Sequence, residues 1–339
     1  MITRSVLTLV AATLATAAIA QSTPPTTEKG ALNARLTGDL TPTHDPVIAR
    51  EGDTFYVFHT GTPVRLRTSR DLVTWKDAGP LPVTLPGWAN KAVPGSEGMW
   101  APDISFVNGR WRLYYSVSTF GSNRSAIGLF TSPTLDPKAP GYGWRDEGLV
   151  VASTERDDFN AIDPNFVRDR DGRHWLALGS FWTGIKLFAL DPRTGKVADL
   201  KARPHAIARR PAPAGGPAPV EAPFIVDHGG YYYQFVSYDY CCKGANSTYY
   251  TVVGRSKAIT GPYLGKDGST LMNGGGSIFL RADLQEKQRF RGPGHPGFLR
   301  DGGKDYVVYH AYDKQNRGVP TLRVAPVSWG ADGWPVADY

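Results

Sequence analysis

DPVIAREGDTFYVF, residues 45–58, joins a short apolar run to a second, aromatic run through a Glu51-Gly52-Asp53 turn. The same order of proline-marked start, apolar run, turn and aromatic run returns four more times. These copies are APDISFVNGRWRLYY at 101–115, DPNFVRDRDGRHWLAL at 163–178, EAPFIVDHGGYYYQF at 221–235 and HPGFLRDGGKDYVVY at 295–309. Their prolines stand roughly 55 to 75 residues apart, a period typical of propellers and solenoids.

Each copy is followed by a second strand pair, for example the apolar run at 185–190, so that one repeat supplies about four strands, the size of a propeller blade. Short runs of aromatic and β-branched residues are broken by Gly, Pro, Asn and Asp, and helical periodicity is scarce. The sequence therefore predicts an all-β fold, a single five-bladed β-propeller over residues 36–339. A β-sandwich with accidental similarity is the alternative, and the recurring order of segments argues against it.

The first twenty residues are typical of a secretory signal peptide. Arg4 precedes an apolar stretch at 6–19, and Ala18-Ile19-Ala20 offers a cleavage site after Ala20. The apolar stretch is too short to span a membrane. We expect residues 21–35 to form a flexible lead-in. The mature protein is expected to be secreted, extracellular or periplasmic, with no membrane partner.

Basic residues outnumber acidic ones, 38 to 31, which gives a formal charge of +7 at pH 7. Such an excess can indicate a nucleic-acid partner. The basic residues are dispersed, however, and their one cluster, at 201–210, runs into a loop rich in Pro and Gly. We therefore expect no nucleic-acid partner, and we expect the protein to be a monomer.

The two cysteines of the chain are adjacent, Cys241-Cys242. Disulfides of secreted proteins usually join distant segments, and no other cysteine is present to complete a zinc site. Two interpretations remain open. Either the pair forms a vicinal disulfide that stiffens a loop near a ligand, or two thiols pack after a strand.

Acidic side chains recur at the starts of the repeats. If each start opens the innermost strand of a blade, six residues gather around one mouth of the channel: Asp45, Trp100, Asp103, Asp163, Glu221 and His295. Hydrolysis of a glycosidic bond needs one protonated acid and one carboxylate that activates water. The chain also carries 14 Phe, 16 Tyr and 9 Trp, whose ring faces stack well on sugars. Together these features indicate an enzyme that acts on sugars.

Five short motifs follow one another along the chain: THDP at 43–46, MWAPD at 99–103, NAIDP at 160–164, VEAP at 220–223 and GPGH at 292–295. Together with YSVSTFG at 115–121, GSFW at 179–182 and YDYCCKG at 238–244, they resemble glycoside hydrolase family 43. The resemblance is greatest to its endo-1,5-α-L-arabinanases. It extends from about residue 40 to the C-terminus, nearly the whole mature chain.

The resemblance implies an inverting mechanism on a five-bladed propeller. Asp45 matches the general base that takes a proton from the attacking water, and Glu221 matches the general acid. Asp163 matches the third carboxylate, which raises the pKa of the acid and orients it, as a nearby negative charge would. The substrate would be arabinan or an arabino-oligosaccharide.

The resemblance also implies a metal ion, commonly Ca²⁺ with mostly water ligands, held with the help of His295. Calcium generally prefers oxygen ligands, so the alternative is that His295 hydrogen-bonds a carboxylate at the mouth. The expected substrate contacts are His44, Trp100, Gly121, Asn160, Ile162, Ser180 and Phe181. Trp100 could equally serve blade packing, and Phe181 could belong to the core.

Three functions remain open. The first is an endo-acting arabinanase that cleaves internal α-1,5 linkages. The second is an exo-acting arabinanase, α-L-arabinofuranosidase or β-xylosidase of the same family. The third is a sugar-binding propeller without catalysis, which would be expected to lack at least one of the three carboxylates, and all three are present.

Overall fold

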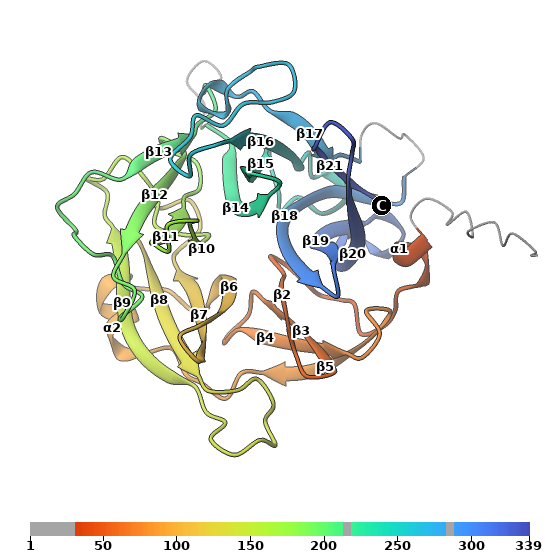
Figure 1. Ribbon diagram of the computed structural model, residues 1–339. Helices are drawn as coiled ribbons and strands as arrows, with labels where there is room; N and C mark the ends of the chain where they lie inside the picture. The colour runs from red at the N-terminus through yellow and green to blue at the C-terminus, as the bar shows by residue number, and fades with distance from the viewer. Residues whose placement is uncertain (1–30, 213–217, 283–287) are drawn as a thin grey trace, which may run out of the picture.

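The computed structural model describes residues 31–212, 218–282 and 288–339, and these form five β-sheets arranged in a ring about a central axis (Figure 1). Each sheet consists of strands that are consecutive in the sequence, except that β1 joins the outer edge of the first. The prediction of a five-bladed β-propeller is confirmed, and the β-sandwich is excluded. The predicted signal peptide, residues 1–20, and residues 21–30 of the predicted lead-in lie outside the described residues.

The blades are numbered in chain order and are listed here from the axis outward. Blade 1 contains β2 (Val47–Glu51), β3 (Thr54–His59), β4 (Arg65–Ser69), β5 (Thr74–Pro80) and β1 (Thr37–Gly38). Blade 2 contains β6 (Trp100–Val107), β7 (Arg110–Val117), β8 (Ser125–Ser132) and β9 (Arg145–Ser153). Blade 3 contains β10 (Asn165–Arg168), β11 (His174–Leu178), β12 (Ile185–Leu190) and β13 (His205–Ala208).

Blade 4 contains β14 (Val220–His228), β15 (Tyr231–Tyr238), β16 (Tyr250–Ser256) and β17 (Ser277–Leu280). Blade 5 contains β18 (Phe290–Asp301), β19 (Lys304–Asp313), β20 (Val319–Trp329) and β21 (Pro335–Ala337). The described helices are short: α1 (Ala31–Arg35), α2 (Gly87–Ala92) and the 3₁₀ turns η1 (Gly244–Asn246), η2 (Leu271–Asn273) and η3 (Lys314–Asn316).

Tight turns join the two inner strands of each blade. In blades 2, 4 and 5 the turn has two residues, Asn108-Gly109, Gly229-Gly230 and Gly302-Gly303, and both residues of each turn have positive φ. That conformation defines a type I′ turn, whose twist matches the twist of the strands, and it explains why Asn and Gly stand there. The turns fix the strand register, for example Phe106 opposite Trp111.

The hydrophobic core lies between blades rather than at the axis. Its five clusters each join neighbouring blades, and the last of them packs Val57 and Trp75 of blade 1 against Val308 and Val324 of blade 5. These four side chains are fully buried. Each blade is therefore stabilised by apolar area that only its neighbours can cover, so the ring must close for the core to be complete.

The segment before blade 1 closes the ring. The Leu322 N–H donates to the Leu40 carbonyl and the Thr43 N–H donates to the Pro320 carbonyl, each over 2.9 Å. Residues 31–35 were expected to belong to the flexible lead-in, and this expectation was wrong because they form α1. Asn33 of α1 is buried, and its side chain donates to the Tyr309 hydroxyl and accepts from the Val324 N–H, both at 3.0 Å.

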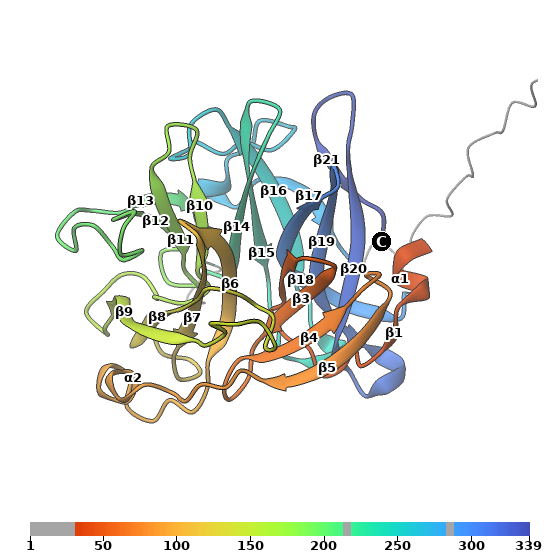
Figure 2. The same ribbon diagram turned by 60° about the horizontal axis from the view of Figure 1, so that its bottom comes forward.

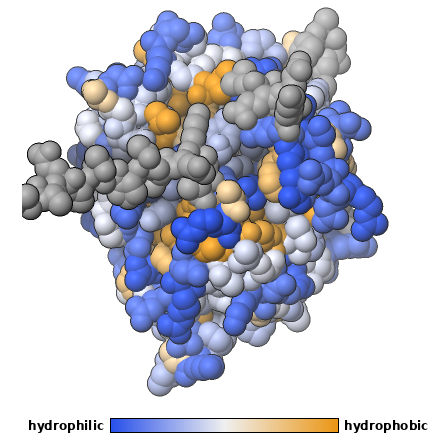
Figure 3. All heavy atoms as spheres, turned by 90° about the vertical axis from the view of Figure 1, so that its right-hand side faces the viewer, coloured by the Kyte–Doolittle hydropathy of each residue, from blue (hydrophilic) through white to orange (hydrophobic). Residues whose placement is uncertain are grey.

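In the side view, the strands of the blades stand in a ring while α2 lies at the lower edge near β8 and β9 (Figure 2). The face near α1 and the C-terminus presents mostly hydrophilic side chains, with a few apolar groups among them (Figure 3). Within the described ranges, no helix is long and apolar enough to cross a membrane.

Candidate active site

In or just before each inner strand stands a residue with left-handed backbone that immediately precedes a proline. We call these five the pivot residues: Asp45 (φ 51°), Ala101 (44°), Asp163 (58°), Ala222 (55°) and His295 (55°). A non-glycine residue pays about 1–3 kcal/mol for this conformation, so it persists only where the surroundings impose it. The acids do not all occupy the pivot position of their repeats. Glu221 precedes its pivot by one residue, and Asp103 follows its own by two.

Side chains brace the N–H groups of the pivots. In four blades the acceptor stands at the end of the second strand of the preceding blade. The Ala101 N–H donates to Thr60 Oγ1 (2.9 Å), Asp163 N–H to Ser116 Oγ (2.9 Å), His295 N–H to Ser237 Oγ (3.0 Å) and Asp45 N–H to His310 Nδ1 (3.1 Å). In the remaining blade, the Ala222 N–H donates to Asp163 Oδ2 (3.1 Å). Each inner strand is thus positioned by its neighbour.

Asp45 is surrounded by hydrogen-bonding and positively polarised groups. Its Oδ1 lies 2.8 Å from His44 Nδ1 and 3.0 Å from His295 Nδ1, while its Oδ2 accepts from the Thr60 hydroxyl at 2.7 Å. Burial would raise the pKa of Asp45. The histidines His44 and His295 outweigh burial and hold that pKa well below its usual value. Asp45 is therefore ionised at neutral pH.

Glu221 lies in a different environment. Its Oε2 accepts a hydrogen bond of 2.8 Å from the Ser180 hydroxyl, and the residue is 9% exposed. Burial raises the pKa of Glu221, while Ser180 opposes the rise. Burial also raises the pKa of Asp163, to about 8, with the charge of Glu221 adding to the effect. Because ionising both buried carboxyls would place two negative charges close together, the pair retains a proton at neutral pH.

Asp103, whose role the sequence left open, links three blades. Its Oδ1 accepts from Asn165 Nδ2 (3.1 Å) and its Oδ2 from the Phe166 N–H (2.9 Å), while Asn165 Oδ1 accepts from the Ile225 N–H (2.8 Å). Burial raises the pKa of Asp103 to about 6. Asp103 and Asn165 occupy equivalent positions of their repeats, and their contact ties the inner strands of blades 2, 3 and 4 together.

We expect Asp103→Ala to lower the free energy of unfolding by about 3 kcal/mol, because two buried donors, Asn165 Nδ2 and the Phe166 N–H, lose their acceptor. Urea denaturation measures this loss. Asp53→Ala is the matched control, since the Asp53 side chain is 83% exposed, and its unfolding midpoint should stay near that of the unaltered protein. Equal midpoints for the two variants would contradict the bracing role.

The residues predicted to contact substrate fall into three groups. His44 and Ser180 bond directly to Asp45 and Glu221. Asn160 and Ile162 are buried just before Asp163, and Asn160 Oδ1 is without a hydrogen-bond partner among the described residues. Three residues lie farther out: Trp100 is half-buried at the start of β6, Phe181 is half-buried with its ring 6.1 Å from that of Tyr240, and Gly121 is exposed after β7.

Sequence reasoning missed Thr60, His310 and Tyr312. His310 is fully buried and its ring stacks on His44 at 3.9 Å. Since its Nδ1 accepts the Asp45 N–H, His310 is neutral there, and burial lowers its pKa well below its usual value. A comparison of the second-strand ends would have found it, because a histidine replaces the hydroxyl residue that stands there in the other blades.

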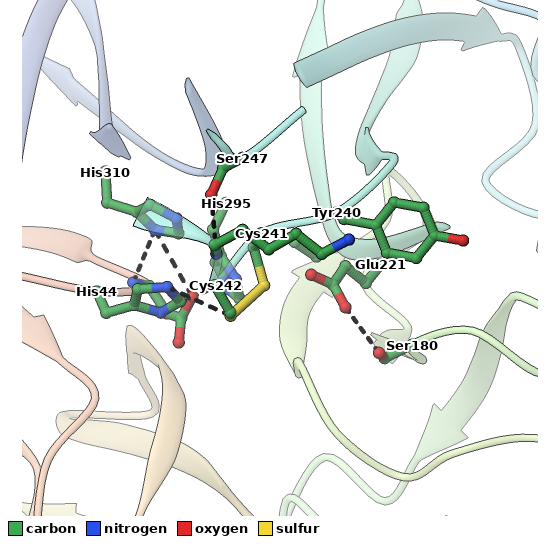
Figure 4. The surroundings of a disulfide bond; sticks show 12 residues. His44, Ser180, Glu221, Tyr240, Cys241, Cys242, Ser247, His295 and His310 are labelled. Carbon is green, nitrogen blue, oxygen red and sulfur yellow. Dashed lines mark hydrogen bonds and ion pairs between the residues drawn. A yellow bond between two sulfur atoms is a disulfide. The ribbon is translucent and has the colours of Figure 1, made fainter. Parts of the chain in front are cut away.

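Cys241 and Cys242 are joined as a disulfide, which decides between the two interpretations of this pair. Figure 4 shows the disulfide between His44 and His310 on one side and Glu221 and Ser180 on the other. Cys242 is exposed, and its Sγ lies 3.8 Å from His44 Nε2. The disulfide is therefore part of the surroundings of the carboxylates.

His295 can offer a metal ion one ligand. Its Nδ1 faces Asp45, so only Nε2 remains, and a carboxylate on the other ring nitrogen is the usual support of a metal-binding histidine. The described residues that come close enough to form a ligand trio are His44, Asp45 and His310, or His44 with the two cysteines. His295 belongs to neither trio, so an ion bound to it would need water for its other ligands.

An ionised carboxylate near a buried carboxyl of raised pKa is the combination that hydrolysis of a glycosidic bond needs. Residues 40–335 match the model of glycosyl hydrolases family 43. The chain is 42% identical over 303 residues to an extracellular exo-α-(1→5)-L-arabinofuranosidase of Cellvibrio japonicus, covering 87% of this chain and 86% of the relative.

It is also 42% identical to an extracellular endo-α-(1→5)-L-arabinanase of Bacillus subtilis, covering 86% of each protein. Among solved structures, the α-L-arabinanase of Cellvibrio cellulosa in complex with arabinohexaose superposes with a TM-score of 0.82 at 40% identity, over 88% of this chain and 96% of the other. The chain belongs to glycosyl hydrolases family 43. Its relatives include both exo- and endo-acting enzymes on α-1,5-linked arabinose.

Proposed function

We propose that this protein hydrolyses internal α-1,5-L-arabinofuranosidic linkages of arabinan with inversion of configuration. The observation that carries the proposal is the contrast between two carboxyls at one mouth. Asp45 is held ionised by His44 and His295, and Glu221 is buried with a raised pKa. Inverting hydrolysis needs such a base and such an acid at the same time.

In the proposed mechanism, a water molecule is positioned between Asp45 and the anomeric carbon. Asp45 accepts a proton from this water as its oxygen attacks. Glu221 donates its proton to the glycosidic oxygen, which departs as the 5-hydroxyl of the next arabinose. The base becomes neutral and the acid becomes charged. Before the next turnover, Asp45 releases its proton to solvent and Glu221 takes one up.

Asp163 is proposed to tune and position the acid. It accepts from the Ala222 N–H, which follows Glu221 directly, so it fixes the backbone that carries the acid. The charge of Glu221 helps to raise the pKa of the Asp163 carboxyl. Loss of the last proton from the pair would place two negative charges side by side, which keeps a proton available for the leaving group.

We expect Asp163→Asn to move the basic limb of the kcat/KM profile to lower pH. In the unaltered protein the pair retains its last proton up to a high pH, because ionising it creates a second buried charge. With a neutral amide at 163, Glu221 ionises more readily, and activity falls earlier as pH rises. A kcat/KM profile measured from pH 4 to 9 checks this. A basic limb at the same pH in both proteins would show that Asp163 does not tune the pKa of Glu221.

The product profile on debranched linear arabinan tests the endo assignment. A ladder of oligomers early in the reaction is expected for an endo enzyme, and one small product from the start would instead identify an exo enzyme. Exo action is the second candidate because one of the relatives is exo-acting.

Polarimetry or proton NMR of the first products tests inversion, which predicts β-arabinofuranose. Absence of any hydrolysis would leave the sugar-binding alternative.

The remaining predicted contacts belong to the same proposal. His44, Trp100, Gly121, Asn160, Ile162, Ser180 and Phe181 are assigned to arabinose binding around the carboxylates. Trp100 and Phe181 supply aromatic surface at the mouth, and Ser180 also holds the acid.

We further propose that the protein is secreted after cleavage of residues 1–20, since both relatives described above are named extracellular. Mass spectrometry of the exported protein gives its first residue, and light scattering tests the expected monomer.

A calcium-type cation is assigned to His295 Nε2, with water as its other ligands. Bound there, a cation would add positive charge beside Asp45. In its absence, Asp45 together with Asp163 and Glu221 outweighs burial and raises the pKa of His295 to about 9. A protonated imidazole then supplies similar charge.

Chelation is therefore expected to lower activity without abolishing it, by about 10-fold, and added Ca²⁺ should restore it. Elemental analysis of the purified protein supplies a second readout. His295→Ala should remove both the bound metal and the response to chelator. Full activity of a protein shown to be metal-free would overturn the assignment.

A further inference from the structure

A chain of hydrogen bonds leads from the disulfide loop to the proposed base. The Cys242 N–H donates to the Tyr312 hydroxyl oxygen at 2.7 Å, and that hydroxyl lies 2.8 Å from His44 Nε2. On the other side of the same ring, His44 Nδ1 lies 2.8 Å from Asp45 Oδ1. The four groups come from blade 4, blade 5 and the segment before β2, so the chain of bonds crosses the ring closure.

The direction of these bonds follows from the donors available. A phenol oxygen has two lone pairs and one proton. The Tyr312 oxygen receives the Cys242 N–H. The ionised Asp45 carboxylate can only accept, so the His44 Nδ1 that faces it carries a proton. The Tyr312 proton is then available for His44 Nε2. A neutral His44 that accepts at Nε2 carries its proton on Nδ1, and this proton points at Asp45.

We propose that Tyr312 and the Cys241–Cys242 disulfide are positioning elements of the reaction, which fix the tautomer of His44 and thereby the orientation of Asp45. The proposal rests on the role of Asp45 proposed above. Neither Tyr312 nor the disulfide touches the carboxylate. They act through His44, whose Nδ1–H holds Oδ1 while Thr60 holds Oδ2.

The disulfide contributes by holding the donor in place. Cys242 has left-handed backbone (φ 65°) and is exposed, so few other contacts fix it. Covalent closure between consecutive residues restricts the conformations that this peptide can adopt. The rest of the loop is held by the Lys243 N–H, which donates to Ser247 Oγ at 3.0 Å. The Cys242 N–H therefore stays directed at Tyr312.

Tyr312→Phe tests the role of the hydroxyl. The ring is retained, so its packing beside His44 and His310 is preserved. We expect kcat on linear arabinan to fall about 10- to 100-fold, because small errors in the placement of a reacting group are costly, while KM stays within about 2-fold. Tyr309→Phe is the matched control. It lies on the same strand, and its hydroxyl bonds Asn33 outside the site, so its thermal midpoint should fall while kcat is unchanged.

A double-mutant cycle tests the connection to the disulfide. We expect the paired change Cys241→Ser and Cys242→Ser to lower kcat about 5-fold when Tyr312 is present. In the Tyr312→Phe background the same paired change should lower kcat by less than about 2-fold. Additive effects would show that the disulfide acts by another route, and this would overturn its part of the proposal. Reduction by dithiothreitol, which gives two electrons and two protons to the disulfide and becomes a cyclic disulfide, should reproduce the effect of the paired Cys→Ser change. The chain has only two cysteines, so the test is specific.

Nitrogen-15 NMR of the imidazole rings supplies a readout that does not depend on turnover. His44 should show an unprotonated Nε2 and a protonated Nδ1, and Tyr312→Phe should mix the two tautomers. If Tyr312→Phe retains full kcat and the tautomer is unchanged, the proposal fails while the function stands. If the unaltered protein does not hydrolyse arabinan, the proposed function fails, and the tautomer measurement still decides the hydrogen-bond chain.

Discussion

Asp45→Ala is expected to lower kcat on linear arabinan by about 10³-fold, the middle of the range for a lost general base. Without the carboxylate, no group takes the proton of the attacking water. The change removes the acceptor that the His44 and His295 side chains share but leaves the apolar core between blades in place, so the fold should survive. Initial rates of reducing-end release measure the effect, and circular dichroism confirms that the propeller is intact.

Azide provides the decisive control for this variant. As an anion it attacks without losing a proton, and it can occupy the space that the carboxylate vacates. We expect sodium azide to restore part of the rate of Asp45→Ala and to yield the β-arabinofuranosyl azide, the product of attack from the face opposite the leaving group. Asp53→Ala, at an exposed site, should retain full activity. A rate for Asp45→Ala close to that of the unaltered protein would remove Asp45 from the mechanism.

Glu221→Gln is expected to cost about 10³-fold on arabinan as well, for the opposite reason. The amide keeps the shape of the side chain and an oxygen for the Ser180 hydroxyl, but it has no acidic proton to give to the leaving oxygen. Departure of an arabinose hydroxyl without protonation is slow. Initial rates on linear arabinan measure the loss, and binding of arabino-oligosaccharides, followed by calorimetry, should be nearly unchanged.

An activated leaving group separates the acid from the base. An arabino-oligosaccharide carrying a dinitrophenyl group releases a stable anion and needs no protonation, so Glu221→Gln should hydrolyse it within about 10-fold of the unaltered rate. Asp45→Ala should remain slow on the same substrate, because its defect lies in the attacking water. If both variants respond alike to the leaving group, the assignment of acid and base is wrong.

The sequence predicted the architecture well because the same signal occurs five times. Proline-marked starts and two-residue turns such as Asn108-Gly109 act locally, so they can be recognised without knowing what lies beside them. The same reasoning assigned the three carboxylates through their motifs. Their roles stay predictions until the variants above are measured, whereas the five blades are confirmed.

The contacts that position the site residues could not be predicted from the sequence, because they join different blades. Asp103 and Asn165 are 62 residues apart in the chain, and His310 meets Asp45 across 265 residues. Comparison of the repeats could single out His310, but no local pattern shows which residue His310 or Asp103 contacts. The lead-in was wrong at residues 31–35 for a similar reason, since Asn33 gains its order from Tyr309 and Val324 in the last blade. Polar composition alone predicted flexibility.

The contacts of the pivot residues imply that activity requires an intact ring of blades. Asp45 depends on a side chain of blade 5, Asp163 on one of blade 2 and His295 on one of blade 4. If one blade detaches, the next loses the brace that holds its functional group. Partly unfolded molecules should therefore be inactive molecules, and heat inactivation should coincide with the loss of ellipticity in one cooperative step. A propeller that has lost one blade contact should be inactive rather than partly active.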